Sequence, residues 1–546
     1  MELFKHQNGW YIPTDAPPQA GRAALVRALQ TLHKPVIVVR DGATIMTATS
    51  GDLTFSANSP DSSALPVLAY VPPLNPHQLG HPSFQDRYGV HANYVAGAMA
   101  NGIASEAVVI EMAKAGLMGF FGAAGLPTER IAEAIQTIRA SVGSLPFGIN
   151  LIHSPQTPQQ EWDSVSLFLD QEIRIVSASA YMKLTKPIVW YRLSGIHRDS
   201  TGTIVVPNRV MAKVSREEVA QQFMKPPPQS MIDALLNEGK ITGQEAALAG
   251  QVSMADDITA EADSGGHTDR QPAPVLLPLM LALRNRITAE YMLQSPIRIG
   301  AAGGITTPEA AAAAFAIGAD YVLTGTINQA CVEAGTSTMV KEMLATASAA
   351  DVDMGPAGDM FEQGAEVQVL KRGTLFAMRG RHLYELYKTY DSIEAIPKDV
   401  RSKLEKQVFR APLEEIWSGC ASFFEERDPK QLERAAREPR HKMALVFRWY
   451  LGLSSRWAIT GDESRKMDTQ IWCGPGIGAF NAWTKGTFLE HPAARSVSIV
   501  AANIMAGAAA ITRARQLLQQ GVDAGPEATV WTPRPLAPST PTPVNS

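Results

Sequence analysis

A single histidine follows two glycines in the segment TAEADSGGHTD, residues 259–269, and its ring is the first candidate for chemistry. The imidazole of His267 titrates near neutral pH, so it can give or take a proton in a reaction. The glycines before it, Gly265 and Gly266, either open a turn or let another body come close to the backbone. A histidine that caps a helix or is satisfied in the core would leave the same local pattern. Its role therefore depends on the element to which the segment belongs.

Two glycine turns further along the chain are typical of a phosphate site. Gly303 and Gly304 end an apolar run and precede TTPE, residues 306–309, where a threonine and a proline mark the start of a helix. Gly325 and Thr326 repeat this arrangement one apolar run later. Bare glycine amides and a helix N-terminus together suit a phosphate, although two ordinary tight turns would look the same. The phosphate could belong to a flavin mononucleotide, a sugar phosphate or a nucleotide.

Four further candidates stand at or near the ends of apolar runs. They are Ala98, Met99, Asn150 and Lys213. A side-chain amide in such a place can bond the edge of a pyrimidine-like ring, and a lysine can stabilise an anionic ring or form a Schiff base. Each of the four, taken singly, is more often structural than functional. Only a shared position on one edge of the fold would make them a site.

Two other patterns do not predict a site. The segment GPGIGA, residues 474–479, satisfies the loose form of a dinucleotide-binding fingerprint, but it follows a helical region and lacks a strand–helix–strand series with its acidic residue. We therefore do not interpret it as a Rossmann loop. The three cysteines, Cys331, Cys420 and Cys473, lie far apart and form no C-x-x-C pair. They predict neither a metal site nor a disulfide framework.

The elements that must position these residues alternate along the central region. Apolar runs predict eight strands at residues 94–100, 116–123, 146–152, 173–180, 209–215, 256–262, 296–304 and 320–326. Helical stretches rich in Ala and Glu lie between them, which implies parallel pairing with right-handed crossovers. Eight such units in roughly 230 residues predict a closed (β/α)8 TIM barrel, with an open doubly wound sheet as the rival. One added hairpin, residues 187–195 with 201–207, is expected before the fifth strand.

A closed barrel would bring the candidates together. The carboxyl ends of all its strands share one rim, where the loops after strands seven and eight usually bind a phosphate.

Other segments flank this barrel, giving an α/β fold with a small α+β N-terminal domain and a C-terminal helical domain. The predicted boundaries are 1–87 for the N-terminal domain, 88–335 for the barrel, 336–470 for a helical unit without strands, 471–524 for a helical segment that packs back on the barrel, and 525–546 for a disordered tail.

Composition narrows the choice of partner and compartment. A net charge of −4 over 546 residues argues against nucleic acid, which needs a concentrated basic surface. The first residues lack the basic end and apolar core of a signal peptide, and the most apolar run, SVSIVAANIMAGAAAI, is too short to span a bilayer. We expect a cytoplasmic protein without a membrane partner. Basic runs from Lys371 to Lys388 and from Arg434 to Lys442 are usual for a solvated helix face, and docking of an acidic protein is the alternative.

Taken in order, the segments that hold the candidates resemble a known family. They are YVAGAMANGIA, GFFGAAG, FGINLIHS, SASAYMKLT, RVMAKVS, ITAEADSGGHTD, RIGAAGGI and VLTGT, and together they are similar to the nitronate monooxygenase-like flavin barrels. Within that family the chain looks most like the trans-acting, FMN-dependent enoyl reductases of polyketide and polyunsaturated fatty acid synthases. The resemblance extends into GDMFEQGAEVQVLKRGTLFAMRGRHLYELYKTYDSIEAIP and IWCGPGIGAFNAWTKGTFL, and it spans about residues 79–517.

This resemblance implies FMN in the barrel, NADPH as co-substrate, and an enoyl chain held on an acyl carrier protein of a polyketide or fatty acid synthase complex. Carried over by position, the residues that would hold the FMN phosphate are Gly303, Gly304, Gly325 and Thr326, and those that would line the isoalloxazine are Ala98, Met99, Asn150 and Lys213. Gly265, Gly266 and His267 match the family's G-G-H element, whose histidine faces the flavin, and we expect the two glycines to give clearance to the flavin and its substrate. Glu261 lies near an acidic flavin-contacting position. Thr268 and Asp269 follow where many relatives have glycine, which weakens the case for monooxygenase chemistry.

Our hypothesis is that His267 donates a proton to the α-carbon of the enoyl group or hydrogen-bonds its thioester carbonyl, and water or Lys183 of the YMKLT segment could do so instead. Three alternatives stay open: a flavin oxidase acting on nitronates, a flavin-free Schiff-base lyase using Lys213, and a carrier-docking subunit without catalysis. The sequence leaves open the acyl chain length, the stereochemistry, the carrier and the oligomeric state. The apolar C-terminal helix could serve a homodimer.

Overall fold

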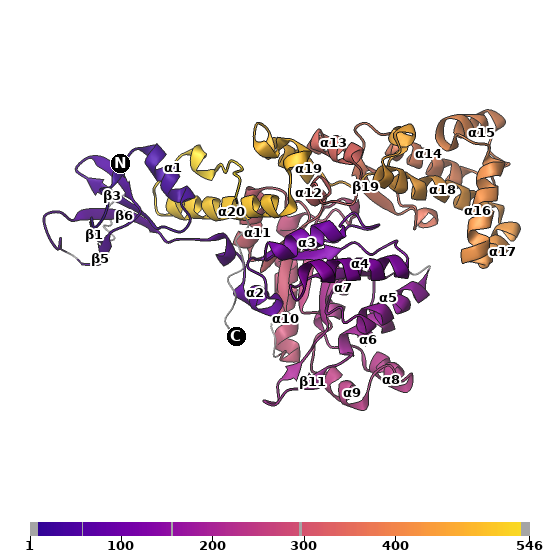
Figure 1. The fold of residues 1–546 in the computed structure, drawn as a ribbon, viewed down its shortest axis with the longest axis horizontal. Helices are drawn as coiled ribbons and strands as arrows, with labels where there is room; N and C mark the ends of the chain where they lie inside the picture. The colour runs from indigo at the N-terminus through magenta and orange to yellow at the C-terminus, as the bar shows by residue number, and fades with distance from the viewer. Residues whose placement is uncertain (1–8, 57, 154–156, 294–296, 537–546) are drawn as a thin grey trace.

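The computed structural model describes residues 9–56, 58–153, 157–293 and 297–536. Figure 1 shows an elongated molecule in three parts. A small unit from the N-terminus lies at one end, the barrel occupies the middle, and a helical unit from the C-terminal half lies at the other end. One long helix, α20 (Val497–Gln519), runs beside both the N-terminal unit and the barrel.

The barrel is closed and consists of eight parallel strands in the spatial order β10-β13-β14-β16-β17-β7-β8-β9. The strands are β7 (Tyr94–Ala96), β8 (Met118–Phe121), β9 (Gly148–Ile152), β10 (Ile175–Ser179), β13 (Arg209–Val214), β14 (Asp257–Glu261), β16 (Arg298–Ala302) and β17 (Tyr321–Thr324). Each lies inside one of the eight predicted runs, although residue 296 of the seventh run is outside the described residues. The closed barrel is confirmed, and the open doubly wound sheet is excluded.

Helices surround the barrel because each strand–helix unit buries an apolar helix face against the sheet. They are α3 (Glu106–Lys114), α4 (Thr128–Val142), α5 (Pro158–Asp170), α6 (Lys186–Leu193), α7 (Glu217–Met224), α8 (Gln229–Asn237), α9 (Gly243–Ala249), α10 (Ala273–Tyr291), α11 (Pro308–Ile317) and α12 (Thr326–Gln329). The helix starts follow ordinary capping chemistry. The hydroxyl of Thr307, for example, accepts a hydrogen bond from the amide of Ala310 at the start of α11.

A short helix, α2 (Pro82–Tyr88), closes the amino-terminal end of the barrel. Its Phe84 ring stacks on Tyr321 of β17, with centroids 4.5 Å apart. Arg298 forms two hydrogen bonds with Asp257, of 2.6 and 3.0 Å, and the hydroxyl of Tyr88 donates to the same carboxylate. This end is therefore a packed floor, which leaves the carboxyl end of the strands for chemistry.

The N-terminal unit is a six-stranded antiparallel sheet with one helix against it. Its elements are β1 (Trp10–Ile12), β2 (Gln19–Ala20), α1 (Arg22–Gln30), β3 (Val36–Asp41), β4 (Thr44–Ala48), β5 (Asp52–Thr54) and β6 (Leu65–Val71). A connection that contains η1 (Pro76–Gln78) leads from the sheet to α2 and the barrel. The α+β character of the predicted first domain agrees with this architecture, but α2 packs with the barrel.

The long helix α20 joins the N-terminal unit to the barrel. Its buried Arg513 donates hydrogen bonds to the carbonyls of Leu29 (2.8 Å), Thr31 (3.1 Å) and Lys34 (2.6 Å). On the barrel side, α20 packs against α11, where a side chain at Gly507 would collide with Pro308. Among the described residues, α20 alone is long and apolar enough to cross a membrane, and 83% of its apolar window is buried within the protein.

The C-terminal region corrects the expectation that strands stop after the barrel. Two strands, β18 (Val352–Pro356) and β19 (Glu366–Leu370), form an antiparallel hairpin that also pairs with β15 (Gly266–His267). The turn of this hairpin contains η3 (Phe361–Gln363). The other elements are α13 (Thr338–Ala345), η2 (Ala349–Asp351), α14 (Phe376–Thr389), α15 (Lys398–Leu404), a π-helical turn η4 (Glu405–Phe409), α16 (Leu413–Arg427), α17 (Pro429–Arg437), α18 (Pro439–Thr460), η5 (Glu463–Asp468), α19 (Gly476–Thr484), η6 (Phe488–Glu490), η7 (Pro492–Ala494) and η8 (Pro526–Thr529).

Two further expectations are wrong. The stretch 187–195 lies mostly in the helix α6, and the hairpin before β13 is a short one between β11 (His197–Arg198) and β12 (Ile204–Val205). The run of β-branched and aromatic residues imitates a strand, but it forms a buried helix. In the predicted disordered tail, residues 525–536 pack against α20, where Asn503 bonds Trp531 and Arg534. The rest of that tail, 537–546, lies outside the described residues.

Candidate active site

An ion pair stands at the carboxyl end of the barrel. Lys213 of β13 and Glu261 of the neighbouring strand β14 approach to 2.7 Å between Nζ and Oε1. Both side chains are largely buried, with 24% and 19% of their surfaces exposed. The hydroxyl of Ser264 donates to the same carboxylate oxygen at 3.2 Å. The structure therefore brings together two residues that the sequence predicted separately.

The loops after the first three strands are tied to this rim. Asn150 of β9 is 7% exposed, and its Oδ1 accepts a hydrogen bond from the amide of Ala124, in the loop after β8, at 3.2 Å. Ala98 packs on the apolar cluster that fills the barrel. The carbonyl of Met99 occupies the place that a side chain at Gly122 would need, only 1.7 Å from an ideal Cβ. The close approach of these loops holds the predicted residues on one edge of the barrel.

The two glycine turns lie side by side, because β16 and β17 are neighbours with Ala302 opposite Leu323. Gly303 and Gly304 both have positive φ angles, of 83° and 73°, which a glycine adopts without strain. A Cβ at Gly304 or at Gly325 would meet no atom within 4 Å. A Cβ at Gly303 would instead lie 2.5 Å from the carbonyl oxygen of Ala262. Gly304 and Gly325 therefore border open space at the end of the barrel, next to the N-terminus of α11, whereas the clearance at Gly303 is taken up by the protein's own chain. This arrangement fits a phosphate group.

A segment from far along the chain packs against the two turns. The amide of Gly474 donates a 3.3 Å hydrogen bond to the hydroxyl of Thr326, and a side chain at Gly476 would lie 2.6 Å from the methyl group of Thr306. These glycines belong to the GPGIGA sequence, which starts the helix α19 outside the barrel strands. The structure thus gives this sequence a packing role beside the phosphate-type turns.

His267 lies outside the barrel sheet but on the same side of the molecule. It belongs to β15, which pairs with β19 so that His267 is opposite Val367. Its Nε2 lies 3.3 Å from Oδ1 of Asp359, and the two side chains are 55% and 64% exposed. The hydrogen bond with Asp359 raises the pKa of His267 above its usual value, partly offset by desolvation and by the positive charge of Lys213. The imidazole is therefore within electrostatic range of the ion pair at the barrel end.

The glycines before His267 have two different functions in the fold. An ideal Cβ at Gly265 would lie 2.7 Å from the backbone nitrogen of Cys473, so the missing side chain makes room for the protein's own chain. Gly266 has a φ angle of 81° and turns the chain into β15. Contact of these glycines with a cofactor stays a prediction, and the clearance at Gly265 is already explained by Cys473.

The residues after His267 tie neighbouring loops together. Asp269 accepts hydrogen bonds from Arg216 (2.9 and 3.0 Å) and from Ser215 (2.5 Å), both in the loop after β13. Thr268 accepts a hydrogen bond from the amide of Ser264 at 3.3 Å. These hydrogen bonds of Thr268 and Asp269 fix the loop that bears His267.

Lys183 stands in the loop after β10, and its side chain is exposed. Behind this loop lies a buried cluster that the sequence did not reveal. Glu161, 3% exposed, accepts a hydrogen bond from Tyr181 (2.8 Å) and approaches His153 Nδ1 to 2.8 Å. Thr185 also donates to this carboxylate. The cluster joins the loops after β9 and β10 and so supports the rim near Lys183.

Two more residues were missed because they come from the hairpin of β18 and β19. Asp359 contacts His267, as described above, and Gln368 donates hydrogen bonds to Asp263 Oδ1 (3.1 Å) and to the carbonyl of Ser264 (2.8 Å). They stand about a hundred residues after the loop that they contact. No local pattern in the sequence connects them to it.

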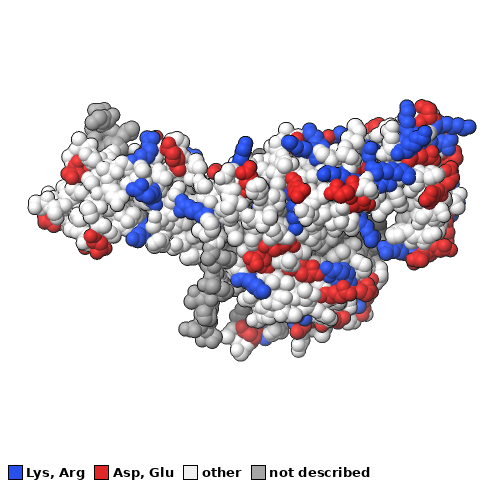
Figure 2. Space-filling model, turned by 45° about the horizontal axis from the view of Figure 1, so that its top comes forward, with Lys and Arg blue, Asp and Glu red and all other residues white. Residues whose placement is uncertain are grey.

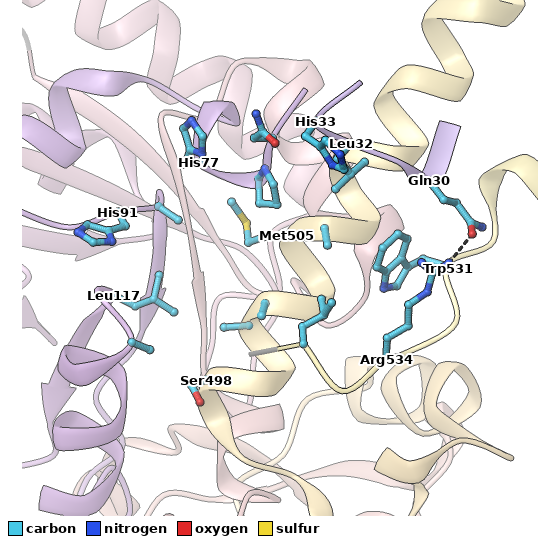
Figure 3. Close-up of a pocket in the computed structure, with 18 of the residues that line it drawn as sticks. Gln30, Leu32, His33, His77, His91, Leu117, Ser498, Met505, Trp531 and Arg534 are labelled. Carbon is cyan, nitrogen blue, oxygen red and sulfur yellow. Dashed lines mark hydrogen bonds between the residues drawn. The ribbon is translucent and has the colours of Figure 1, made fainter. Parts of the chain in front are cut away.

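A cavity of about 510 Å³ lies elsewhere, between the N-terminal connection, α20 and the chain end. Figure 3 shows His77, His33 and Trp531 around Met505, with Arg534 bonded to Gln30 at its edge. Its wall on the barrel side comes from residues that precede β7 and β8, near the floor of the barrel. No predicted site residue lines this cavity, so it is separate from the candidate active site.

Two family profiles match the chain. The nitronate monooxygenase profile matches residues 89–377, which contain the barrel and the hairpin of β18 and β19. The profile of the inserted helical domain of [acyl-carrier-protein] S-malonyltransferase matches residues 390–469, within the C-terminal helical unit. Residues 1–88 precede both ranges.

Several known proteins are similar to most of the chain. A polyunsaturated fatty acid synthase polypeptide of Thraustochytrium sp. is 46% identical over 77% of this chain and 28% of its own length. Polyketide biosynthesis protein PksE of Bacillus subtilis is 42% identical over 82% of this chain and 60% of its own length. The chain therefore spans less than two thirds of these curated relatives. The crystal structure of the enoyl reductase domain of MlnA, from the macrolactin biosynthesis cluster of Bacillus amyloliquefaciens, is 38% identical with a TM-score of 0.78, covering 81% of this chain and 99% of that domain.

Proposed function

Because the chain belongs to the nitronate monooxygenase family and, within it, to the enoyl reductases of polyketide and polyunsaturated fatty acid synthases, we propose that it reduces the α,β double bond of an enoyl thioester. The observation that carries this proposal is the likeness to the MlnA enoyl reductase domain, which extends over 99% of that domain. The family implies a flavin. FMN as that flavin, NADPH as the reductant and an acyl carrier protein as the holder of the substrate are finer parts of the same proposal.

The residues at the barrel end fit FMN. Gly304 and Gly325 border open space beside the N-terminus of α11, where a phosphate would be bound by backbone amides. Asn150 and Lys213 would contact the ring system from the neighbouring strand ends, with Glu261 fixing the position of the lysine ammonium. Bound FMN, reduced by NADPH, would supply the hydride that adds to the β-carbon of the substrate.

The protein's own residues would supply the rest of the reaction. Hydride addition at the β-carbon places negative charge on the α-carbon and the thioester oxygen, and a proton must then reach the α-carbon. We assign this proton to His267, whose pKa is raised by Asp359. A proton taken from water afterwards returns the imidazole to its starting state. Lys183, exposed on the rim, is the alternative donor.

The substrate's carrier would dock near the C-terminal helical unit, which matches a domain found in an enzyme that acts on acyl carrier protein. Figure 2 shows basic and acidic side chains intermingled over this unit, rather than one basic field. Ion pairs account for much of the predicted basic runs, including Arg381 with Asp353, Lys388 with Glu385 and Arg434 with Glu438. Docking by a few local contacts is therefore a better proposal than docking by a large positive surface.

Turnover with two substrate classes tests the proposed function. A purified, flavin-loaded sample receives either crotonyl-N-acetylcysteamine with NADPH or a nitroalkane in air. We expect NADPH consumption and formation of the saturated butyryl thioester, identified by mass spectrometry. If the nitroalkane sample consumes oxygen and the thioester sample consumes no NADPH, the chain would instead be assigned to oxidative chemistry.

A further inference from the structure

The strand that carries His267 is held by the C-terminal region. In the described part of the chain, β15 pairs with β19, and the two strands belong to the hairpin sheet rather than to the barrel. The loop that carries His267 follows a barrel strand, but its pairing with the hairpin fixes the position of His267 in space. A barrel without the hairpin would leave the histidine on an unsupported loop.

Two contacts fix the backbone just before the histidine. Gln368 of β19 is 6% exposed, and its Nε2 donates hydrogen bonds to Asp263 Oδ1 and to the carbonyl of Ser264. Gly265 packs directly on the backbone of Cys473. The backbone amide of Cys473 is itself 3.3 Å from the carbonyl of Gln368, so both contacts tie the loop to β19 or to the segment beside it.

Asp359 is itself anchored at the turn of the hairpin. Two residues after it, Phe361 is fully buried and packs against Tyr384, Tyr387 and Phe447, with ring centroids 5.2 to 6.3 Å away. An exposed carboxylate on a well-packed turn loses little additional entropy when it holds a partner. The contact of Asp359 with His267 is thus between two groups whose backbones are both fixed.

We propose that Asp359 is a positioning residue for His267, holding the imidazole through Nε2 so that Nδ1 is the nitrogen offered to the substrate. The inference rests on the proposed function only for the step in which His267 gives up its proton. Asp359 need not touch the substrate. A carboxylate on one ring nitrogen favours the doubly protonated imidazolium, the form that can donate a proton from the other nitrogen.

Three charged groups act on this histidine. Asp359 and Glu261 favour its protonated form, and Lys213 opposes it. Since Lys213 and Glu261 are paired with each other at 2.7 Å, their effects largely cancel and Asp359 decides the balance. A step that needs protonated His267 would therefore slow as the pH rises through the raised pKa of the histidine. Without the Asp359 carboxylate this loss would begin at a lower pH.

A histidine titration tests the dyad directly. The flavin-loaded protein is labelled with 13C at histidine Cε1, and the His267 resonance is identified as the one lost in His267→Gln. Three proteins are titrated: wild type, Asp359→Asn and Asp353→Asn. Asp353 lies on the same hairpin and is paired with Arg381, so it controls for a general loss of negative charge. The alkaline limb of the pH profile for enoyl reduction is measured on the same proteins.

We expect Asp359→Asn to lower the titration midpoint of His267 and to move the alkaline limb of kcat to lower pH, with kcat at pH 7.5 falling about tenfold. Asp353→Asn should change neither, and Asp359→Glu should restore the midpoint toward wild type. An unchanged midpoint in Asp359→Asn would overturn the proposal. If Asp359→Asn misfolds, the wild-type protein alone still tests the proposal. The titration midpoint of its His267 should fall as NaCl rises to 1 M, because salt screens an exposed ion pair. A midpoint that does not change with salt would also overturn the proposal. The titration reports on the dyad even if the chain reduces no enoyl thioester, so the two failures are distinguishable.

Discussion

Lys213 of β13 and Glu261 of β14 form a 2.7 Å ion pair at the end of the barrel where the phosphate-type turns also lie. The pair is partly shielded from water, so each charge has more effect on a bound ring than a surface charge would have. Glu261 also accepts a hydrogen bond from the hydroxyl of Ser264, a residue of the loop that carries His267. The pair therefore connects the proposed ring-binding side of the site with the histidine loop.

Replacement of Lys213 tests the role of this pair. Lys213→Met removes the cation but keeps most of the apolar stem, so we expect a folded protein with at least about tenfold weaker flavin binding. The control is Lys186→Met, which removes a lysine paired with Glu238 on the outside of the barrel. The measurement is flavin fluorescence titration of the apoprotein. Equal dissociation constants for Lys213→Met and wild type would contradict the assignment.

Gly325 offers a selective test of the phosphate site. A Cβ there would project into open space, although the backbone angles of Gly325, φ −132° and ψ −77°, lie outside the favoured regions for a residue with a side chain. We expect Gly325→Val to lower the thermal midpoint through backbone strain, to remain folded at 25 °C, and to bind FMN at least about tenfold more weakly. Riboflavin, which lacks the phosphate, should bind both proteins alike. Gly419→Val, at a second open position in α16, should leave FMN binding unchanged. A uniform loss for both flavins would mean that the valine disturbs the ring site instead.

Gly265 should tolerate alanine less well than an ordinary loop glycine. A methyl group there would collide with the backbone of Cys473, which cannot move as a flexible side chain could. We expect Gly265→Ala to destabilise the protein by about 1–3 kcal/mol. Gly266→Ala would make only an ordinary 3.9 Å contact with the Trp472 ring but must adopt a φ angle of 81°, at a cost of about 1 kcal/mol. Urea unfolding compares the two variants, and a smaller effect at Gly265 would show that the contact with Cys473 is loose.

Acid stability should depend on Asp256, which lies between Arg87 (2.7 Å) and Arg192 (2.5 Å) near the barrel floor. Burial alone would raise the pKa of Asp256, but these arginines and Arg298 outweigh it and lower the pKa to about 2. A depressed carboxylate pKa stabilises the fold above its unfolded value, near 3.8, and that stability is lost as the pH falls toward 2.

We therefore expect Asp256→Asn to cost about 3 kcal/mol at pH 7, since it leaves Arg192 buried without its counter-charge. The difference from wild type should shrink as the pH falls below about 4. Thermal unfolding at pH 7, 5, 4 and 3 measures it, with Asp233→Asn on the exposed face of α8 as the control. A difference that stays constant over this range would mean that Asp256 stabilises the fold by packing alone.

The sequence was sufficient for the barrel because strands buried on both faces leave uninterrupted apolar runs, and all eight runs became strands. It was also sufficient to place Lys213 and the two glycine turns together, since strand ends in a barrel converge on one rim. Glu261 was expected only from the family resemblance. Helix α6 was mistaken for a strand because its core is rich in Ile, Val, Trp and Tyr. Tertiary burial overrode that local preference.

The contacts around His267 could not be predicted. β15 has two residues, and its partner β19 begins about a hundred residues later, so neither strand leaves a periodic pattern that names the other. Asp359 and Gln368 reach the loop of His267 only because this pairing places the hairpin beside it. Gly265 was expected to make room for a ligand, whereas a distant backbone segment fills that space. A close approach by a ligand and a close approach by the protein's own backbone both require glycine, and only the folded structure shows which of the two occurs.

A single anaerobic experiment tests the central claim most directly. The flavin-loaded protein is titrated with NADPH until the flavin absorbance near 450 nm is lost, and a crotonyl thioester is then added without oxygen. The account predicts that the absorbance returns with one equivalent of butyryl thioester formed per flavin. Bleaching by NADPH that persists after the thioester is added, and reverses only when oxygen is admitted, would contradict enoyl reduction.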